Sequence, residues 1–458
     1  MNLRAGQSRP ERPSSFRRLL SLGSTRTGVL VLTTVGTLVV RTVSSMLLTR
    51  LLIPDDFGVV GIIGSVFYTV ALLTDIGTYA FLIRHERGDD RRFRDVIWTI
   101  HAERGFALFL VVAIVSPLIA RALGKPAIAL PLAVASLTFA INAFASLSLV
   151  TALRNDKSRQ LSLFEFGHQV TQTILCILLA VWWRNVWALI GAMVLQATFR
   201  TVLSYWIFPD ARHRPTRDRA IFRELMAFSR FVLVSSILTF FIAQTDKLVL
   251  ARLFSLHEFG LYAIALSITS APTSFADSYV QRIAFPLYAQ HWRDAPFEIP
   301  RIYYKIRRFP SALFALGAGG LIGGAPFLVA LLYDPRYAPA ATFISLLMIS
   351  VALRLPNAAA MQLLTATGDL KRLVQTNVVR VVWLAVAIPA GFVALGAMGV
   401  VAAVGLIELP AMLFTWTLLA KIKVLDLRQE LLFLGIIATG AAAGAAFSAE
   451  ALYLFPHL

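Results

Sequence analysis

Apolar runs long enough to cross a lipid bilayer recur from Val29 almost to the end of this 458-residue chain. A helix needs about 20 mostly apolar residues to span the hydrocarbon core, and short charged or turn-rich stretches separate runs of that length here. Because lipid offers no hydrogen-bond partners, each run must pair its own backbone groups and is predicted to be helical. The pattern predicts an all-α, polytopic membrane protein with about 12 to 14 transmembrane helices.

The predicted spans fall into two sets of six. The first set lies near 28–48, 57–83, 96–120, 127–150, 161–183 and 186–208. The second set lies near 225–250, 259–285, 309–333, 339–366, 374–396 and 398–420. A further apolar stretch follows from Leu431 to about Leu454, and we expect it to form a peripheral helix.

Composition and charge agree with this class. Only 15% of the residues are charged, whereas soluble proteins carry about 25%, and no soluble domain fits between the spans. The net charge of +18 could suggest a nucleic-acid partner, but the basic residues fall mainly in alternate loops, as membrane orientation requires. We therefore expect no nucleic-acid binding. The single cysteine, Cys176, has no intrachain partner for a disulfide.

The distribution of Lys and Arg predicts the orientation of the chain. The basic segments are the tail 1–27 and the loops near 84–95, 154–160, 211–219 and 301–308. They should all be cytoplasmic, the N-terminus included. The opposite loops, near Arg121 and Tyr333, carry one or two positive charges each. Since Arg41 interrupts the first run and no A-x-A-like site follows it, we expect a retained helix and not a cleaved signal peptide.

One segment of the chain occurs twice. "TRLLIPDDFGVV" runs from Thr49 to Val60, and "ARLFSLHEFGLY" runs from Ala251 to Tyr262. At an offset of 202 residues the identical pairs are Arg50 and Arg252, Leu51 and Leu253, Phe57 and Phe259, Gly58 and Gly260, Ile62 and Ile264, Ser65 and Ser267, and Asp75 and Asp277. An ungapped match with charged residues at both ends of a helix indicates internal duplication.

The number of spans between the copies fixes how the halves are related. Six spans separate them, so both copies cross the membrane in the same direction and the halves are parallel repeats. Such repeats are related by an axis along the membrane normal and enclose a substrate site at their interface. The sequence thus predicts two six-helix bundles, 28–208 and 225–420, around a central cavity. A cytoplasmic linker, 209–224, joins them, and 421–458 forms a cytoplasmic loop and the peripheral helix.

The repeated motif itself is interpreted as structural. Gly58 and Gly260 open the second helix of each copy, where a missing side chain permits close backbone approach. Asp56 and Glu258 lie at helix starts, whose free N–H groups favour an acid.

These residues resemble a known family. "RLLIPDDFGVVGI", "TDIGTYAFLIRHERGDDRRFRDVIWT" and "TDKLVLARLFSLHEFGLYAIA" look like the polysaccharide-transporter (Wzx-like) branch of the multidrug/oligosaccharidyl-lipid/polysaccharide exporter superfamily. The resemblance implies flipping of a polyprenyl-pyrophosphate-linked oligosaccharide from the cytoplasmic to the periplasmic leaflet of a bacterial inner membrane, for O-antigen, capsule or exopolysaccharide assembly. It also implies a polysaccharide polymerase and chain-length machinery as partners, and a cavity lined by the first, second, seventh and eighth helices.

Two other functions compete with flipping. The chain has no G-x-x-x-x-G-K-[ST], no H-E-x-x-H and no paired-Cys motif, and we expect neither catalysis nor a cofactor or metal. A membrane polysaccharide polymerase or ligase would resemble proteins with a large periplasmic loop, whereas every outer loop here is short. A drug or small-cation exporter of the same superfamily should favour acids in its cavity. The predicted helix interiors instead hold Arg41, Arg104, Arg200, Arg230, Lys247, Arg354 and Arg380 against Asp75, Glu103, Glu165, Asp246 and Asp277.

The excess of basic residues predicts an anionic cargo, since Arg can bind phosphate oxygens bidentately. The substrate-binding candidates are Arg41, Arg104, Arg200, Lys247 and Arg354. Arg41 is the principal one because it lies about 20 Å from the cytoplasmic edge of the first span, too deep to reach the membrane surface easily. The alternative role for Arg41 is a buried ion pair with Asp246.

The candidates for gating or coupling are Asp75, Asp246, Asp277, Arg230 and Arg282. Asp75 and Asp277 each follow their repeated Phe by 18 residues, about 27 Å along a helix, and therefore belong near the cytoplasmic end. We expect them to help close a cytoplasmic gate by pairing with basic groups such as Arg282, Arg84 or Arg230. Glu165 and His168 could simply pair on one helix face.

Overall fold

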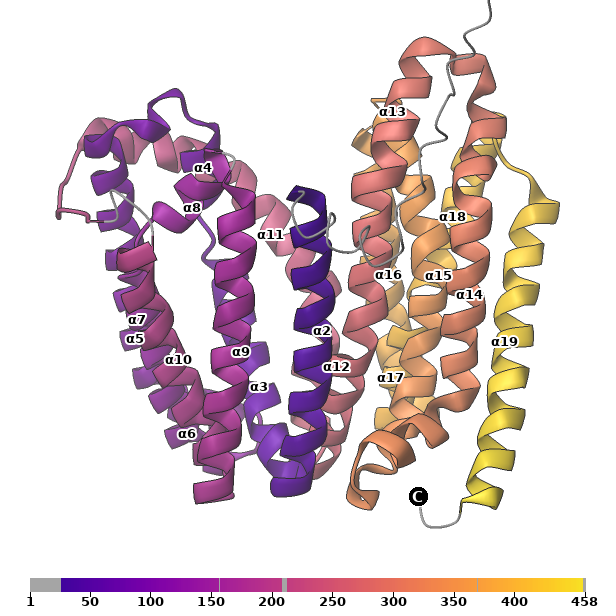
Figure 1. The fold of residues 1–458 in the computed structure, drawn as a ribbon, viewed down its shortest axis with the longest axis horizontal. Coiled ribbons are helices and arrows are strands. Elements are labelled where there is room, and N and C mark those ends of the chain that lie inside the picture. The colour runs from indigo at the N-terminus through magenta and orange to yellow at the C-terminus, as the bar shows by residue number, and fades with distance from the viewer. Residues whose placement is uncertain (1–25, 156, 208–211, 369, 456–458) are drawn as a thin grey trace, which may run out of the picture.

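The computed structural model describes residues 26–155, 157–207, 212–368 and 370–455, and the regular elements in these ranges are all helices (Figure 1). Thirteen helical segments in these ranges are long and apolar enough to cross a membrane, and some of them combine consecutive labelled helices. The predicted fold class is confirmed. The basic tail predicted for 1–27 lies almost wholly outside the described residues.

The N-terminal lobe contains the first six spans. Its helices are α2 (Arg26–Leu51), α3 (Pro54–Leu73), α4 (Thr78–Arg84), α5 (Arg91–Ala122), α6 (Ala129–Ala135), α7 (Leu137–Ala143), α8 (Ser148–Arg154), α9 (Ser158–Trp183) and α10 (Val186–Ile207), with the 3-10 turns η1 (Glu86–Asp89) and η2 (Pro126–Ile128). The fourth predicted span, 127–150, is wrong at its end, because its last residues form the separate short helix α8.

The second predicted span, 57–83, is also interrupted. Helix α3 ends at Leu73, and α4 begins after Gly77, which adopts φ +69°. Glycine tolerates this left-handed conformation at no steric cost, and Asp75 Oδ1 accepts a hydrogen bond from the Gly77 N–H at 2.8 Å. The break therefore comes from a turn that the apolar pattern alone does not reveal.

The C-terminal lobe contains the remaining spans. Its helices are α11 (Arg219–Leu253), α12 (Leu256–Tyr279), α13 (Phe285–Asp294), α14 (Ile299–Leu332), α15 (Ala340–Ala366), α16 (Leu370–Leu395), α17 (Ala397–Gly405), α18 (Glu408–Lys421) and α19 (Leu427–Leu454). A π-helical turn, η3 (Val280–Ala284), joins α12 to α13, and the 3-10 turns η4 (Pro296–Glu298) and η5 (Pro335–Tyr337) precede α14 and α15.

The repeated segments begin their helices in the same way. In α3, Asp56 accepts a hydrogen bond from the Ile53 N–H at 3.3 Å. In α12, Glu258 accepts one from the Ser255 N–H at 2.8 Å while the Ser255 side chain accepts from the Glu258 N–H at 3.1 Å, which completes a capping box. The predicted capping role of both acids is confirmed.

Helices α3 and α12 cross through their duplicated residues. A Cβ on Gly58 would collide with the Leu256 carbonyl, and a Cβ on Gly260 would collide with the carbonyl of Pro54. At the offset of 202, Pro54 corresponds to Leu256 and Gly58 to Gly260. Each glycine therefore packs against the same position of the other copy. Reciprocal contact between equivalent positions is the signature of a twofold arrangement. The duplication therefore places an approximate twofold axis between α3 and α12, as the parallel repeats predicted.

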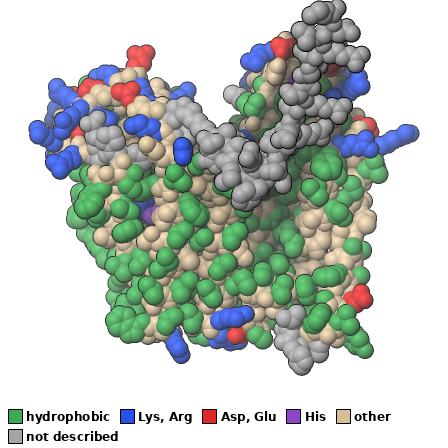
Figure 2. Space-filling view, in the orientation of Figure 1, with side chains coloured by type: hydrophobic (Ala, Val, Ile, Leu, Met, Phe, Trp, Pro, Cys, Tyr) green, Lys and Arg blue, Asp and Glu red, His purple; other side chains and the backbone are tan. Residues whose placement is uncertain are grey.

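The two lobes meet at one end of the molecule and separate toward the other (Figure 1). The α2–α3 and α11–α12 turns lie at the joined end, and α4, α8, α13 and α18 lie toward the separated end. Lys and Arg side chains gather at the tips of the separated lobes, while the sides are mainly hydrophobic (Figure 2). The apolar sides match a lipid environment, and the basic tips match the positive-inside pattern.

Helix α19 packs along α14 at the far edge of the C-terminal lobe (Figure 1). Small residues make the close approach possible, since a Cβ on Gly319 or Gly323 would collide with the backbone of α19. Arg307 and Glu430, 1% and 3% exposed, form a buried ion pair of 2.6 Å between the same helices. The helix predicted after Leu431 is thus fixed to the lobe by both packing and charge.

Candidate substrate cavity

A cavity of about 290 Å³ lies between the lobes, beside the α3–α12 crossing. Helices α2, α3, α9 and α12 line it. Its polar and charged lining residues are Arg41, Ser44, Ser45, Gln169, Gln172, Thr173 and Ser267. The cavity therefore offers one cation and several neutral hydrogen-bonding groups.

A second cavity, of about 250 Å³, is lined by α3, α11 and α12 and shares Gly61 and Ala263 with the first. Lys247 and Gln244 line it. Oε1 of Gln244 is buried and has no hydrogen-bond partner among the described residues. No described carboxylate lines either cavity. Together they form a cationic, amide-rich site where the duplicated helices meet.

Arg41 lies on α2 about 15 Å from the helix's C-terminal end. The side chain is exposed and forms no ion pair with any residue in the described ranges. The alternative partner, Asp246, is buried and accepts a hydrogen bond from the Tyr262 hydroxyl at 2.6 Å. The Arg41–Asp246 pair is thus not formed, and Asp246 acts within the C-terminal lobe as an acceptor for α12.

Lys247 is the other predicted cation that lines a cavity. Its Nζ donates to the carbonyl of Ala243, one turn earlier on α11, at 2.6 Å. At the repeat offset, Ala243 corresponds to Arg41, and Lys247 corresponds to Ser45. The two lobes therefore each supply one cation, but from positions one helical turn apart.

Arg104 and Arg200 are held inside the N-terminal lobe. Nη2 of Arg104 donates to Oγ1 of Thr74 at 2.9 Å and to the Ala71 carbonyl at 3.3 Å. Arg200 forms a 2.5 Å ion pair with Glu165. His168 contacts Gln196 and not Glu165, contrary to the expected i, i+3 pair.

Arg354 belongs to an ionic network in the C-terminal lobe. Its guanidinium donates to both carboxylate oxygens of Asp277 at 3.1 Å and to Glu408 at 3.4 Å. Glu408, only 1% exposed, also accepts from Arg380 at 2.8 Å and from Asn357 at 2.8 Å. Arg354, predicted as a substrate-binding candidate, lines neither of the two cavities and is instead paired with two acids.

The predicted gating residues are not paired as expected. Asp277 binds Arg354 instead of Arg282, Arg84 or Arg230. Asp75 is used in the turn between α3 and α4. Arg230 lies over the ring of Phe231, its guanidinium carbon 4.8 Å from the ring centre. Arg282 is exposed at the π-helical turn.

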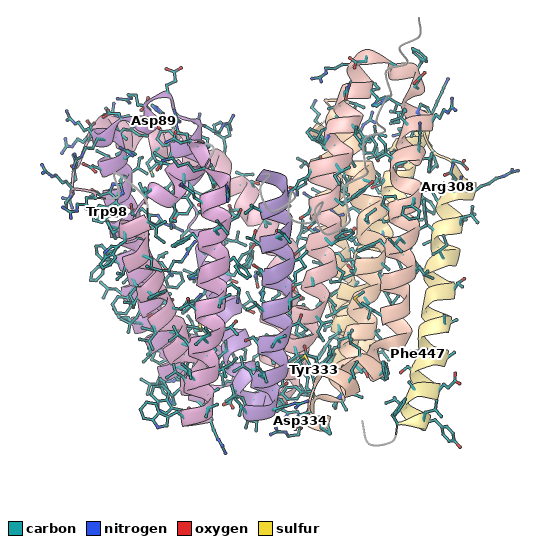
Figure 3. All side chains as sticks on the ribbon, in the orientation of Figure 1. Asp89, Trp98, Arg308, Tyr333, Asp334 and Phe447 are labelled. Atoms are coloured by element: carbon teal, nitrogen blue, oxygen red, sulfur yellow. The ribbon has the colours of Figure 1, made fainter. Side chains whose placement is uncertain are left out.

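Hydrogen bonds between the lobes hold the joined end in two places, which we call clasps, and each lobe supplies one of them. In the first, the η5 turn reaches the N-terminal lobe, where the Tyr337 hydroxyl donates to the Leu52 carbonyl at 3.0 Å. Nearby, Tyr333 and Ser45 share a hydrogen bond of 3.2 Å, and Figure 3 shows Tyr333 near this end. In the second, the η2 turn reaches the C-terminal lobe, where Nζ of Lys125 donates to the Ala251 carbonyl at 2.6 Å.

Several of these residues were missed from the sequence. Glu408 is the single charged residue in the predicted span 398–420. A lone acid in a membrane helix requires a partner, so this signal could have found the network. The glutamines of the cavity and the clasp residue Tyr337 gave no comparable signal, because an uncharged side chain does not require a charged partner.

The fold and the site define a class: a two-lobed, duplicated membrane transporter with a cationic cavity between its lobes. Comparison with known proteins makes the class more specific. Residues 47–342 match the family model described as "Polysaccharide biosynthesis protein", and the chain belongs to that family. The family expected from the sequence is confirmed.

Two curated relatives are similar to this chain. The "Succinoglycan biosynthesis transport protein ExoT" of Rhizobium meliloti is 25% identical over 58% of this chain, and the match spans 53% of that protein's length. The "Uncharacterized membrane protein in cps region" of Klebsiella pneumoniae is 23% identical over 74% of this chain and 70% of that protein.

Solved structures share the fold. A structure of "Lipid II flippase MurJ, inward closed conformation" covers 92% of both chains with a TM-score of 0.69 and 10% identity. An "Inward-facing conformation of a multidrug resistance MATE family transporter of the MOP superfamily" covers 87% of this chain and 95% of its own, with a TM-score of 0.59 and 14% identity. This chain therefore shares its fold with these two solved transporter structures.

Proposed function

We propose that this protein carries a polyprenyl-pyrophosphate-linked oligosaccharide from the cytoplasmic to the periplasmic leaflet of a bacterial inner membrane. The product would serve O-antigen, capsule or exopolysaccharide assembly, with a polysaccharide polymerase and chain-length machinery acting next. The observation that carries this proposal is the cavity lined by Arg41, Lys247 and amide side chains without a carboxylate.

The chemistry of the cavity fits such a cargo in two parts. A pyrophosphate is an anion that Arg can bind with two parallel hydrogen bonds. Sugar hydroxyls donate and accept hydrogen bonds, as the amides of Gln169, Gln172 and Gln244 do. A cavity for a cationic drug would need carboxylates, so the exporter alternative is less well supported by the same lining.

The mechanism would be alternating access without covalent chemistry. We take 28–208 and 225–420 as the moving units, linked by 209–224, with the N-terminus and the basic tips in the cytoplasm. The cavity would load from the separated, basic end. Release would require the clasps of Tyr337 and Lys125 to open while the basic tips approach each other.

Deletion of the gene, followed by analysis of lipid-linked intermediates, tests this function. We expect completed but unpolymerised repeat units to accumulate on the cytoplasmic leaflet, and the surface glycan to be lost. Expression of the wild-type chain should restore both. Normal surface glycan together with altered drug tolerance would instead support the exporter.

A further inference from the structure

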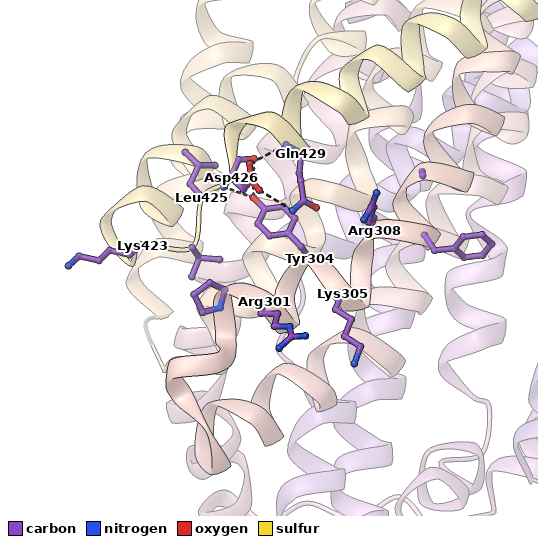
Figure 4. A pocket seen from close by; sticks show the side chains of 12 residues that line it. Arg301, Tyr304, Lys305, Arg308, Lys423, Leu425, Asp426 and Gln429 are labelled. Carbon is purple, nitrogen blue, oxygen red and sulfur yellow. Dashed lines mark hydrogen bonds between the residues drawn. The ribbon is translucent and has the colours of Figure 1, made fainter.

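A separate pocket of about 850 Å³ opens at the basic end of the C-terminal lobe. It lies between the first turns of α14 and the segment that joins α18 to α19, as Figure 4 shows. None of its lining residues lines the central cavities. Figure 3 places Arg308, one of its residues, at the outer edge of the lobe beside α19.

The pocket has a strong positive charge. Arg301, Lys305 and Arg308 follow one another at i, i+4 and i+7 along one face of α14. Lys423 lines the pocket from the joining segment, and its side chain extends away from those three (Figure 4). All four are exposed, and within the described ranges none of them forms an ion pair. The three cations of α14, which no acid pairs with, indicate a site for an anion.

The acid in the lining is already engaged. Asp426 caps α19 by accepting from the Arg428 N–H at 3.0 Å, and it also accepts from the Gln429 side chain at 3.0 Å. The hydrogen bond from Gln429 and those from the backbone hold the pKa of Asp426 below its usual value. Its carboxylate thus stays charged in the cap and is directed at α19.

The walls of the pocket are fixed by buried polar contacts. The Tyr304 hydroxyl donates to Glu430 at 2.9 Å and accepts from the Asp426 N–H at 2.8 Å. The buried Arg307–Glu430 pair holds the same carboxylate from the other side. The two helices therefore present the basic side chains on a preformed frame, which lowers the entropic cost of binding.

The pocket also lies at the depth of lipid headgroups. The apolar part of α14 runs from Phe309 to Leu332, about 35 Å at 1.5 Å per residue, which matches the hydrocarbon core. Arg308 thus sits at the boundary of that core. Phe309 lines the pocket, and the exposed apolar side chains of Phe309, Leu313 and Leu316 continue from it at i, i+4 and i+7 along α14, on a face adjacent to that of the basic residues.

We propose that this pocket binds the phosphate headgroup of an anionic glycerophospholipid, whose acyl chains lie along the exposed face of α14. An anionic head above apolar chains matches a basic pocket above an apolar helix face. The polyprenyl-pyrophosphate cargo has related chemistry, but the pocket shares no residue with the central cavity. The lipid site does not depend on the proposed transport function.

Native mass spectrometry of the purified full-length chain tests the site. The probes are dioleoylphosphatidylglycerol, dioleoylphosphatidylcholine and undecaprenyl pyrophosphate, each titrated separately. We expect the wild-type chain to bind phosphatidylglycerol more tightly than phosphatidylcholine. The triple variant Arg301→Gln, Lys305→Gln, Arg308→Gln should lose phosphatidylglycerol affinity by about tenfold or more.

A matched control removes three exposed arginines that lie outside the pocket: Arg84→Gln and Arg91→Gln in the N-terminal lobe, and Arg223→Gln near the start of α11. Both variants lose the same net charge, so a general charge effect would weaken both equally. Selective loss in the pocket variant supports the site. The proposal would be overturned if the wild-type chain bound both phospholipids equally, or if both variants lost phosphatidylglycerol affinity equally. It would also be overturned if the pocket variant lost only undecaprenyl pyrophosphate binding, because the pocket would then belong to the cargo.

Discussion

The two lobes share their helix packing but use their charged residues differently. At the crossing of α3 and α12, Gly58 and Gly260 make reciprocal contacts. Oδ2 of Asp55 lies 3.3 Å from Nδ1 of His257, and these two residues occupy equivalent positions in the two copies of the repeat. The equivalent acids further along the helices differ. Asp75 accepts a backbone N–H in a turn, whereas Asp277 accepts two hydrogen bonds from Arg354.

This difference shows which part of a duplication is free to change. A backbone crossing tolerates only glycine in both copies, because any side chain would collide. A charged residue can change partner as long as each buried charge remains compensated. The N-terminal lobe therefore leaves Arg41 facing the cavity, while the C-terminal lobe neutralises Arg354 and Arg380 with Asp277 and Glu408.

The largest expected effect comes from breaking the C-terminal network. Glu408→Gln removes the buried charge that Arg354 and Arg380 share, and loss of one partner of a buried pair costs about 3 kcal/mol or more. We expect a lower unfolding temperature of the purified protein in detergent. Glu103→Gln is the control, since its pair with Arg217 is exposed and worth under about 1 kcal/mol. A Glu408→Gln protein as stable as the wild type would contradict the network's structural role.

Removal of the Arg41 charge should reduce transport and leave the stability of the protein unchanged. Arg41→Gln loses a charged hydrogen-bond donor, which corresponds to about tenfold to a hundredfold weaker cargo binding, and we expect near-complete loss of surface glycan in complemented cells. Arg41→Lys keeps the charge without the planar fork and should retain part of the activity. Arg50→Gln, at the outer turn, serves as the control. Full activity of Arg41→Gln at normal abundance would exclude Arg41 from cargo binding.

The duplicated acids give a direct comparison of the lobes. Asp277→Asn removes the charge opposite Arg354 and should reduce transport by several-fold. Asp75→Asn can still accept the Gly77 N–H through its amide oxygen and should have a smaller effect. Glycan yield normalised to membrane abundance measures both. Equal effects would mean that the two acids retain the same role despite their different contacts.

Breaking a clasp should have the smallest effect, and the effect should be equal for the two clasps. Tyr337→Phe and Lys125→Met each remove one hydrogen bond between the lobes, worth about 1 kcal/mol, which should shift the conformational equilibrium about fivefold toward opening of the joined end. Spin labels at Arg184 and Tyr453, in a Cys176→Ala background, would report a longer distance. Tyr68→Phe is the control. The double variant combines Tyr337→Phe with Lys125→Met. An unchanged distance distribution in it would show that the clasps do not hold this end closed.

The sequence by itself determined the architecture. Bilayer thickness and backbone pairing restrict apolar runs to helices of one length class, and the thirteen predicted spans correspond to the thirteen candidate membrane-spanning segments in the described part of the chain. The spacing of the repeat predicted the parallel halves and the close approach at Gly58 and Gly260. These inferences depend on local length and on chain order, which a sequence records directly.

Only the tertiary structure decided which charges face the cavity. Depth along a helix follows from counting residues, so Arg41 was predicted to be deep, and Arg354 was predicted as a cavity residue from its place in a span. The direction in which each side chain points depends on how its helix is rotated against neighbours. Asp277 and Arg354 are 77 residues apart in the sequence, and Arg354 and Glu408 are 54 apart. Such pairs form between helices that meet only after packing, and for this reason Arg354 became part of a network while Arg41 remained available for an anion.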